Sequence, residues 1–249
     1  MANYQLLNNV EHKDLKIVID RSAELGDNVW YAVTFPAEFR ALQRHYPVFF
    51  IKNPDDGEYR AVAMFGVEEG ENLFLDDTGW NATYIPLNIM RQPLLIGYQK
   101  QEVGGRVTRE PMVTIDMDSP RVSSEAGEPL FLEHGGNSDY LEQVNSILHM
   151  LLDGMRSCKP FFKMLEELNL LESFVMDAQL YDGSEHRLAG FHTINEDALK
   201  KLDGAELELL NSKGYLEPIY MVIASMTNLP LLLERKNQMR RAEEEHAEH

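Results

Sequence analysis

The side chains best suited to hold a ligand lie between residues 72 and 98 of this chain. Arg91 can bind a carboxylate through two parallel hydrogen bonds, and Trp80 and Tyr84 can stack on a planar group. Aromatic and arginine side chains also anchor many concave sites and protein interfaces. We therefore predict that this region binds a small ligand or a partner protein through Asn72, Trp80, Tyr84, Arg91 and Tyr98. In the alternative interpretation, the aromatic rings fill the core between a sheet and a helix, and Arg91 pairs with one of many nearby acids.

Motifs for nucleophilic catalysis and phosphate binding are absent from the sequence. It contains no Gly-x-Ser-x-Gly, no Walker-type Gly-Lys-Ser/Thr and no Gly-x-Gly-x-x-Gly. Adjacent carboxylates recur, but general acid–base catalysis requires one of them to have a raised pKa, which depends on burial. Only Asp76-Asp77 lies beside Trp80, and its Thr-Gly continuation is typical of a turn. We predict no catalytic residue and favour a non-enzymatic role.

Metal chemistry has one weak candidate. His12-Lys13-Asp14 matches half of the two-histidine, one-carboxylate set that binds non-haem iron, and His134, His186 or His192 are possible second histidines. A three-residue match arises easily by chance, and His12 lies in a polar segment where we expect it to be exposed. Cys158 is the only cysteine, which excludes an intrachain disulfide and a cysteine-based zinc site. We therefore predict no metal and no cofactor.

The charge balance limits the partners. The net charge of −18 repels nucleic-acid backbones and anionic lipid headgroups, so neither is an expected partner. The N-terminus has no basic-then-apolar run typical of a signal peptide. The longest apolar run, Ile219–Met226, is shorter than the roughly 20 residues of a membrane helix. We expect a cytoplasmic protein that is not integral to a membrane; export through an uncleaved C-terminal signal and the oligomeric state stay open.

The first half of the chain predicts β-hairpins. Apolar runs separated by turn residues indicate paired strands, and a capping residue followed by an early proline indicates a short helix. The predicted strands are 47–51 with 59–67, 72–75 with 82–85, and 94–98 and 112–117. A long polar loop is predicted over 100–109, and a short helix from Thr34 to about His45.

The second half predicts more helix. Ser138 is a capping residue for a helix with apolar residues at helical spacing through Met155, and Asp182-Gly183 is a preferred hairpin turn. The remaining predicted elements are a helix from Pro160 to Leu171, strands 174–181 and 185–194, a helix from Asn195 to Gly214, a strand over 218–225, and a terminal helix from Thr227 or Asn228 with a frayed acidic tail at 243–249. Together these elements predict an α+β fold in a single domain, 1–249, with a β-hairpin-rich N-terminal half containing an antiparallel sheet. The more helical C-terminal half ends in a long helix.

The chain resembles the SapC family over nearly its whole length. The residues that carry the resemblance in the first half are Gly66, Glu69-Gly70-x-Asn72-Leu73-Phe74, Gly79-Trp80, Tyr84-Ile85-Pro86 and Arg91-x-Pro93. In the second half they are Gly127-Glu128-x-Leu130-Phe131, Asp182-Gly183, Leu188-Ala-Gly-Phe191, Leu199, Leu202, Gly214-x-Leu216 and Tyr220. The chain departs from the family pattern at Met90 and Leu94, where a second arginine and a phenylalanine are usual.

The resemblance implies a role rather than a reaction. The family is bacterial and is associated by name with surface layers, and it is distinct from the peptide-transporter permease of the same name. Its members are encoded near outer-membrane receptors and homologues of flavin-dependent tryptophan halogenases, which implies an accessory role in uptake or modification. The first hypothesis is therefore a non-enzymatic accessory or binding protein of a surface-layer or outer-membrane uptake system. The alternatives are an oxygenase-like enzyme that modifies a peptide or aromatic substrate, and a structural component of a surface layer.

Overall fold

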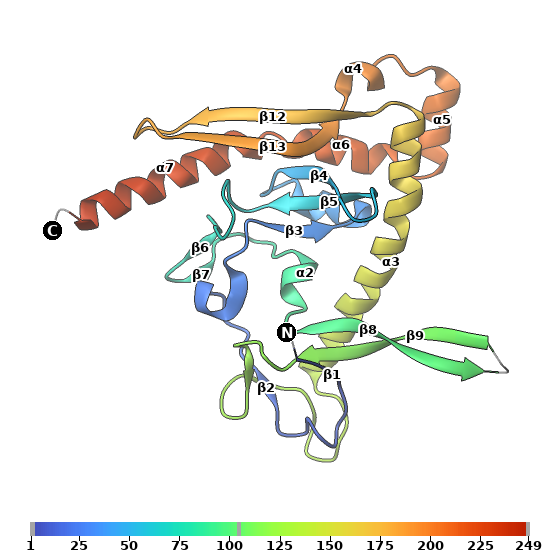
Figure 1. Cartoon of the computed structure of the whole chain (residues 1–249), viewed down its shortest axis with the longest axis vertical. Coiled ribbons are helices and arrows are strands. Elements are labelled where there is room, and N and C mark those ends of the chain that lie inside the picture. The colour runs from blue at the N-terminus through green and yellow to red at the C-terminus, as the bar shows by residue number, and fades with distance from the viewer. Residues whose placement is uncertain (1–2, 104–105, 248–249) are drawn as a thin grey trace. The chain divides into compact units, whose positions relative to one another are not determined.

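The computed structural model describes residues 3–103 and 106–247, with the backbone alone for 100–103, 106–108 and 246–247 (Figure 1). Contacts between Cα atoms divide the chain into two compact units. Unit 1 comprises Met1–Asp27 and Leu87–Asp153, and unit 2 comprises Asn28–Pro86 and Gly154–His249. Both units combine helices with antiparallel strands, which confirms the predicted α+β class. A single domain over 1–249 stays a prediction.

Unit 1 is built on an antiparallel sheet in the order β1-β9-β8. The strands are β1 (Tyr4–Leu6), β8 (Leu94–Val103) and β9 (Arg106–Asp116). Leu94 and Ile115 face each other across β8 and β9, and both are fully buried. The remaining elements are η1 (Ala23–Asp27), α2 (Leu87–Met90) and a small sheet of β2 (Lys16–Ile17), β10 (Val122–Ser123) and β11 (Glu128–Pro129).

The prediction of a polar loop over 100–109 is wrong. The main-chain ladder of β8 and β9 continues to the pair Val103 and Arg106, and residues 104–105 lie outside the described part of the chain. Main-chain hydrogen bonds between strands do not depend on apolar side chains, so an antiparallel ladder can extend through polar sequence. The composition of this stretch therefore misled the prediction.

Unit 2 contains a larger antiparallel sheet in the order β12-β13-β4-β5-β3. Its strands are β3 (Tyr31–Thr34), β4 (Val48–Lys52), β5 (Tyr59–Met64), β12 (Leu171–Gln179) and β13 (Glu185–Ile194). Both predicted hairpins, β4–β5 and β12–β13, are confirmed. Gly183 in the second turn has φ of +83°, a value that glycine adopts without a steric cost. The predicted pairing of 72–75 with 82–85 is not formed. Instead β6 (Leu75–Asp76) pairs with β7 (Gly79–Trp80) across a shorter turn.

The helices of unit 2 include one segment that was predicted as a strand. They are η2 (Pro36–Glu38), α1 (Phe39–Leu42), α4 (Glu196–Leu199), α5 (Gly204–Ser212), α6 (Leu216–Ser225) and α7 (Asn228–Ala247). The strand predicted over 218–225 is wrong, because this segment forms α6. Ile219, Val222 and Ser225 recur at helical spacing and are fully buried, and Pro218 lies in the first turn, where its missing N–H costs little. This periodic burial outweighs the β-propensity of the individual residues.

Helix α3 (Asp139–Glu167) crosses the boundary between the units. The Ser138 hydroxyl accepts a hydrogen bond from the Leu141 amide at 3.1 Å, which confirms the predicted cap. The prediction of a separate helix beginning at Pro160 is wrong, since α3 continues through this residue. An interior proline costs a helix about 3 kcal/mol. Phe161 and Leu165, which follow it, are fully buried, and each contributes about 1.5–3 kcal/mol, enough to offset that cost.

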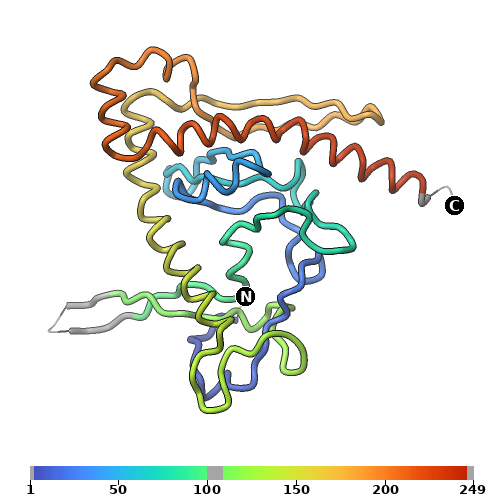
Figure 2. Tube along the Cα trace, turned by 180° about the vertical axis from the view of Figure 1, so that it is seen from behind, coloured from blue at the N-terminus to red at the C-terminus, as the bar shows by residue number. Residues whose placement is uncertain are grey.

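The C-terminal segments α6 and α7 run beside the β12–β13 hairpin, as both views show (Figures 1 and 2). Asn195 caps α4 as predicted, but the predicted helix to Gly214 is interrupted before a capping box at Asp203. The terminal helix is confirmed as α7, and fraying of 243–249 stays a prediction.

By length and composition, the stretch Leu216–Glu245 is apolar enough to cross a membrane, with 39% of its apolar window buried. This stretch is longer than the apolar run Ile219–Met226, because uncharged Thr227 and Asn228 interrupt it only briefly. One such stretch is weak evidence for a membrane span, since the core helix of a water-soluble protein has the same composition.

Candidate ligand-binding site

The predicted site residues fall into both units. Asn72, Trp80 and Tyr84 belong to unit 2, whereas Arg91 and Tyr98 belong to unit 1. Joint binding by all five therefore stays a prediction.

In unit 2 the polar atoms of Trp80 and Tyr84 have partners inside the protein. The Trp80 indole N–H donates to the Tyr46 hydroxyl at 2.7 Å, and that hydroxyl donates to the Tyr84 carbonyl at 2.5 Å. The Trp80 ring also meets Phe65 edge-on, with centroids 5.1 Å apart. Asn72 is buried, and its side-chain oxygen accepts the Phe74 amide at 3.0 Å. These contacts support the alternative interpretation, in which the three residues pack the core.

The network around Tyr84 ends on a buried carboxylate. Glu38 is 4% exposed and accepts hydrogen bonds from the Tyr84 hydroxyl at 2.9 Å and from the Thr34 hydroxyl at 2.6 Å. Burial and the nearby Glu38 charge raise the pKa of the Tyr84 phenol, and burial likewise raises the pKa of Tyr46. Both phenols are therefore neutral donors at physiological pH, and the Tyr84 phenol stabilises the carboxylate directly.

Arg91 lies between α2 and β8 and is held in one orientation. Its backbone follows α2, with the Arg91 amide donating to the Leu87 carbonyl at 3.1 Å. The Arg91 Nε donates to the Asn88 side-chain oxygen at 2.7 Å, and Nη1 donates to the Leu94 carbonyl at 2.8 Å. Among the described residues, these neutral acceptors are the partners of the guanidinium, and no carboxylate lies within ion-pair distance. Burial lowers the pKa of Arg91, while Tyr4 partly opposes that effect.

Two other arginines of unit 1, the buried Arg121 and the partly buried Arg21, have an acidic partner. Arg121 is 1% exposed and pairs with the fully buried Asp27 at 2.6 Å, and Arg21 reaches the same carboxylate at 3.3 Å. A desolvated guanidinium is costly unless a negative charge compensates it. Asp27 supplies that charge to Arg21 and Arg121, whereas no described acidic side chain lies within ion-pair distance of Arg91, although Asp116 and Asp118 line the same cavity as Arg91. This is the feature expected of an arginine whose counter-charge arrives with a ligand.

Arg91 opens onto a cavity of about 350 Å³ within unit 1. Its walls come from β1, η1, the start of β8 and the segment after β9, and its lining residues are Tyr4, Leu25, Gly26, Arg91, Gln92, Pro93, Leu95, Asp116, Asp118, Ser119 and Pro120. This volume suits a small organic ligand. Tyr98 is not among the lining residues. It lies on β8, opposite Pro111 of β9, and is 58% exposed.

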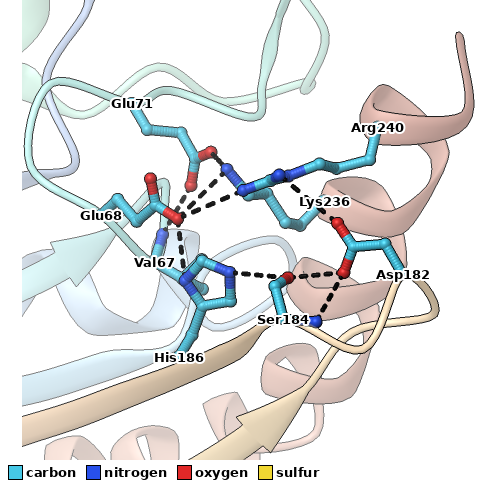
Figure 3. Close-up of polar contacts among 8 residues, drawn as sticks. All are labelled: Val67, Glu68, Glu71, Asp182, Ser184, His186, Lys236 and Arg240. Carbon is cyan, nitrogen blue, oxygen red and sulfur yellow. Dashed lines mark hydrogen bonds and ion pairs between the residues drawn. The ribbon is translucent and has the colours of Figure 1, made fainter. Parts of the chain in front are cut away.

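A second polar cluster, which the sequence did not indicate, lies in unit 2 (Figure 3). We call it the α7 charge cluster, and its members are Glu68, Glu71, Asp182, Ser184, His186, Lys236 and Arg240. Lys236 is buried and pairs with Glu71, and its amine also lies 3.5 Å from Glu68. Arg240 lies 3.4 Å from Asp182 and 3.7 Å from Glu68. The cluster thus joins residues 67–71, the β12–β13 turn and α7.

Part of this cluster has the order of a catalytic triad. His186 Nδ1 lies 2.7 Å from Glu68, and Nε2 lies 3.4 Å from the Ser184 hydroxyl. The same hydroxyl lies only 2.5 Å from Asp182, which also accepts the Ser184 amide at 2.8 Å. The hydroxyl hydrogen and the amide are therefore engaged by Asp182, as in an ordinary Asx turn. The arrangement fits a structural clamp better than an activated nucleophile.

The remaining candidates for metal binding or catalysis, His12 and Asp76, form hydrogen bonds with neighbouring residues. His12 is 2% exposed rather than exposed as expected, and its ring nitrogens contact Asn8 and Gln5. Among the residues whose side chains the structure describes, 3–99 and 109–245, no three histidine, cysteine or acidic residues are grouped to hold a metal. Asp76 accepts hydrogen bonds from the Thr78 hydroxyl and amide, which lower the pKa of Asp76 and confirm the turn.

The fold and the Arg91 cavity thus define an α+β protein of two compact units, one of which contains a cavity of about 350 Å³. The family model for SapC matches residues 7–232. The chain belongs to the SapC family, as the sequence resemblance indicated. Neither the curated proteins nor the solved structures contain a match to it.

Proposed function

We propose that this protein is a non-enzymatic accessory protein of a bacterial surface-layer or outer-membrane uptake system. In this proposal the Arg91 cavity binds a carboxylate group of a small ligand or of a partner protein. The observation that carries it is the oriented guanidinium of Arg91, which is held by two neutral acceptors and has no acidic partner among the described residues. A cytoplasmic location is part of the proposal, and cell fractionation tests it.

The chemistry of the cavity favours a carboxylate. The two bonds to Asn88 and Leu94 fix the plane of the guanidinium, and Nη2 has no hydrogen-bond partner among the residues that the structure describes. A charge-assisted hydrogen bond to a desolvated arginine is stronger than a neutral one. Asp116 and Asp118 also line the cavity, so a bare polyanion is disfavoured and a ligand with a single carboxylate is preferred.

The test compares binding by the wild type and by Arg91→Lys, which keeps the charge but loses the planar fork. Calorimetric titrations with acetate and benzoate as probes should show about 5-fold to 150-fold weaker binding for the variant, as expected for about 1–3 kcal/mol. Arg109→Lys, at an exposed position on β9, is the matched control and should bind as the wild type does.

Thermal unfolding of the same variants separates a binding role from a structural role. If Arg91→Lys loses affinity while its melting temperature stays near that of the wild type, the binding role is supported. Unchanged affinity, or a loss of affinity that merely follows a large loss of stability, would exclude Arg91 as a ligand-binding residue.

A further inference from the structure

Unit 2 contains a cavity of about 420 Å³ that is separate from the Arg91 cavity. One wall is the segment from Gly57 to Arg60, where the β4–β5 turn enters β5. The opposite wall is the second half of α3, which presents Met155, Cys158 and Phe162 at helical spacing. Every lining residue belongs to unit 2.

The inner part of this cavity is apolar. Cys158 and Phe162 are buried, and the Tyr59 ring stacks on Phe162 with centroids 5.8 Å apart. The Cys158 thiol contacts the carbonyl oxygens of Gly154 and Thr34 at 3.6 and 3.9 Å. Burial raises the pKa of Cys158 to about 12, so the thiol is neutral at physiological pH and forms part of an apolar surface. This surface can accept an acyl chain or an aromatic ring.

Charged side chains of both signs line the outer part of the cavity. Arg60, Lys159 and Lys163 line it, against Glu58 and Glu166. The cations have acidic partners at the surface: Lys159 with Glu58, Arg60 with Asp56, and Lys163 with Glu167. All of these side chains are at least 43% exposed. Exposed pairs of this kind contribute at most about 1 kcal/mol, so an anion at the mouth can replace an acidic partner.

We infer that this cavity is a second binding site, for a monocarboxylate with an apolar body such as an acyl or aryl acid. The apolar body occupies the space beside Cys158 and Phe162, and the carboxylate lies at the mouth near Lys159 and Lys163. Both the burial of the apolar part and the attraction to the cations are needed, so a neutral or cationic analogue binds more weakly. This site does not depend on the function proposed for Arg91.

The single cysteine supplies a local measurement of occupancy. Cys158 is the only thiol in the chain and lines the cavity, so its reaction with an uncharged maleimide reports access to this position. The probe is 4-phenylbutyrate, compared with the matched alcohol 4-phenylbutanol and the matched amine 4-phenylbutylamine. Calorimetry gives the affinity of each compound, and mass spectrometry gives the rate of labelling.

At saturation, 4-phenylbutyrate should slow Cys158 labelling at least about 5-fold, and the alcohol and amine should bind at least about 10-fold more weakly, as expected for one lost charge-assisted bond. Lys159→Met together with Lys163→Met should remove this preference for the carboxylate. Lys200→Met is the matched control, because Lys200 is exposed in unit 2 and pairs with Glu196 in the same i, i+4 manner.

The possible outcomes distinguish this site from the Arg91 cavity. Binding of 4-phenylbutyrate that leaves Cys158 labelling unchanged would place the ligand elsewhere and overturn the inference. Equal binding of the three compounds would also overturn it, because the cations at the mouth would then have no role. Failure of the Arg91→Lys test leaves these measurements unaffected.

Discussion

Replacement of Asp27 by asparagine should strongly destabilise unit 1. Asp27 is fully buried and accepts hydrogen bonds from Arg121 at 2.6 Å, Arg21 at 3.3 Å and the Ser22 amide at 3.1 Å. The asparagine side chain would keep an acceptor oxygen but would leave two desolvated guanidinium groups without a counter-charge. Burial and repulsion from Arg121 already lower the pKa of Arg21, and the Asp27 charge opposes both effects.

Removal of one partner from a buried ion pair costs about 3–5 kcal/mol. We expect about 3 kcal/mol for Asp27→Asn, at the lower end of that range, because the amide retains part of the hydrogen bonding. Urea unfolding followed by circular dichroism measures this loss, and hydrogen exchange should locate it in unit 1. Asp177→Asn is the control: Asp177 lies 3.7 Å from Arg187, both are about 70% exposed, and the change should be within about 0.5 kcal/mol.

A second substitution tests the electrostatic reason. Arg21→Met in the Asp27→Asn background should recover part of the lost stability, since it removes one of the two facing positive charges. A loss below about 1 kcal/mol for Asp27→Asn would refute the reasoning, as would a double variant less stable than the single one.

Two further predictions concern unit 2. Tyr84→Phe should cost about 1.5–3 kcal/mol of unfolding free energy, since it removes a hydrogen bond to the buried Glu38 carboxylate and keeps the ring; a loss under about 0.5 kcal/mol would contradict the network. Stability should fall as the pH drops below about 6.5, the ordinary histidine pKa. Burial lowers the pKa values of His192 and His45, so the unfolded chain binds protons that the folded chain does not. His192→Asn should reduce the difference in urea midpoint between about pH 7.5 and about pH 5.5, on either side of that pKa, and an unchanged difference would contradict this assignment.

The sequence was most informative where a local rule decides the structure. The Asp182-Gly183 turn, the Ser138 cap and the Asn195 cap each depend on residues a few positions apart, and all are confirmed. It failed where tertiary burial overrides a local preference, as at Pro160 inside α3 and in the β-branched segment that forms α6. Local rules use only the residues near each position in the sequence. The continuation of α3 through Pro160 and the helical form of α6 depend instead on which residues of each helix are buried in the fold.

The candidate sites show the same limit. Arg91 was identified from its residue type, but its lack of an acidic partner among the described residues is a property of the folded unit. Trp80 and Tyr84 were grouped with it because they are near in sequence, although their polar atoms bond within unit 2. Nothing in the sequence links Glu71 with Lys236, which lie 165 positions apart.

The α7 charge cluster bears on the order in which the chain folds. The pairing of Lys236 with Glu71 spans 165 positions and that of Arg240 with Asp182 spans 58, so both require distant segments to meet. Closing such loops is entropically costly unless the intervening structure already holds the ends close. We therefore expect the β12–β13 hairpin and the sheet beside it to form before the second half of α7 docks. Because that half is attached largely through charges, whereas buried Leu229 and Leu232 secure only its beginning, it is the part of unit 2 that should detach first in a local opening.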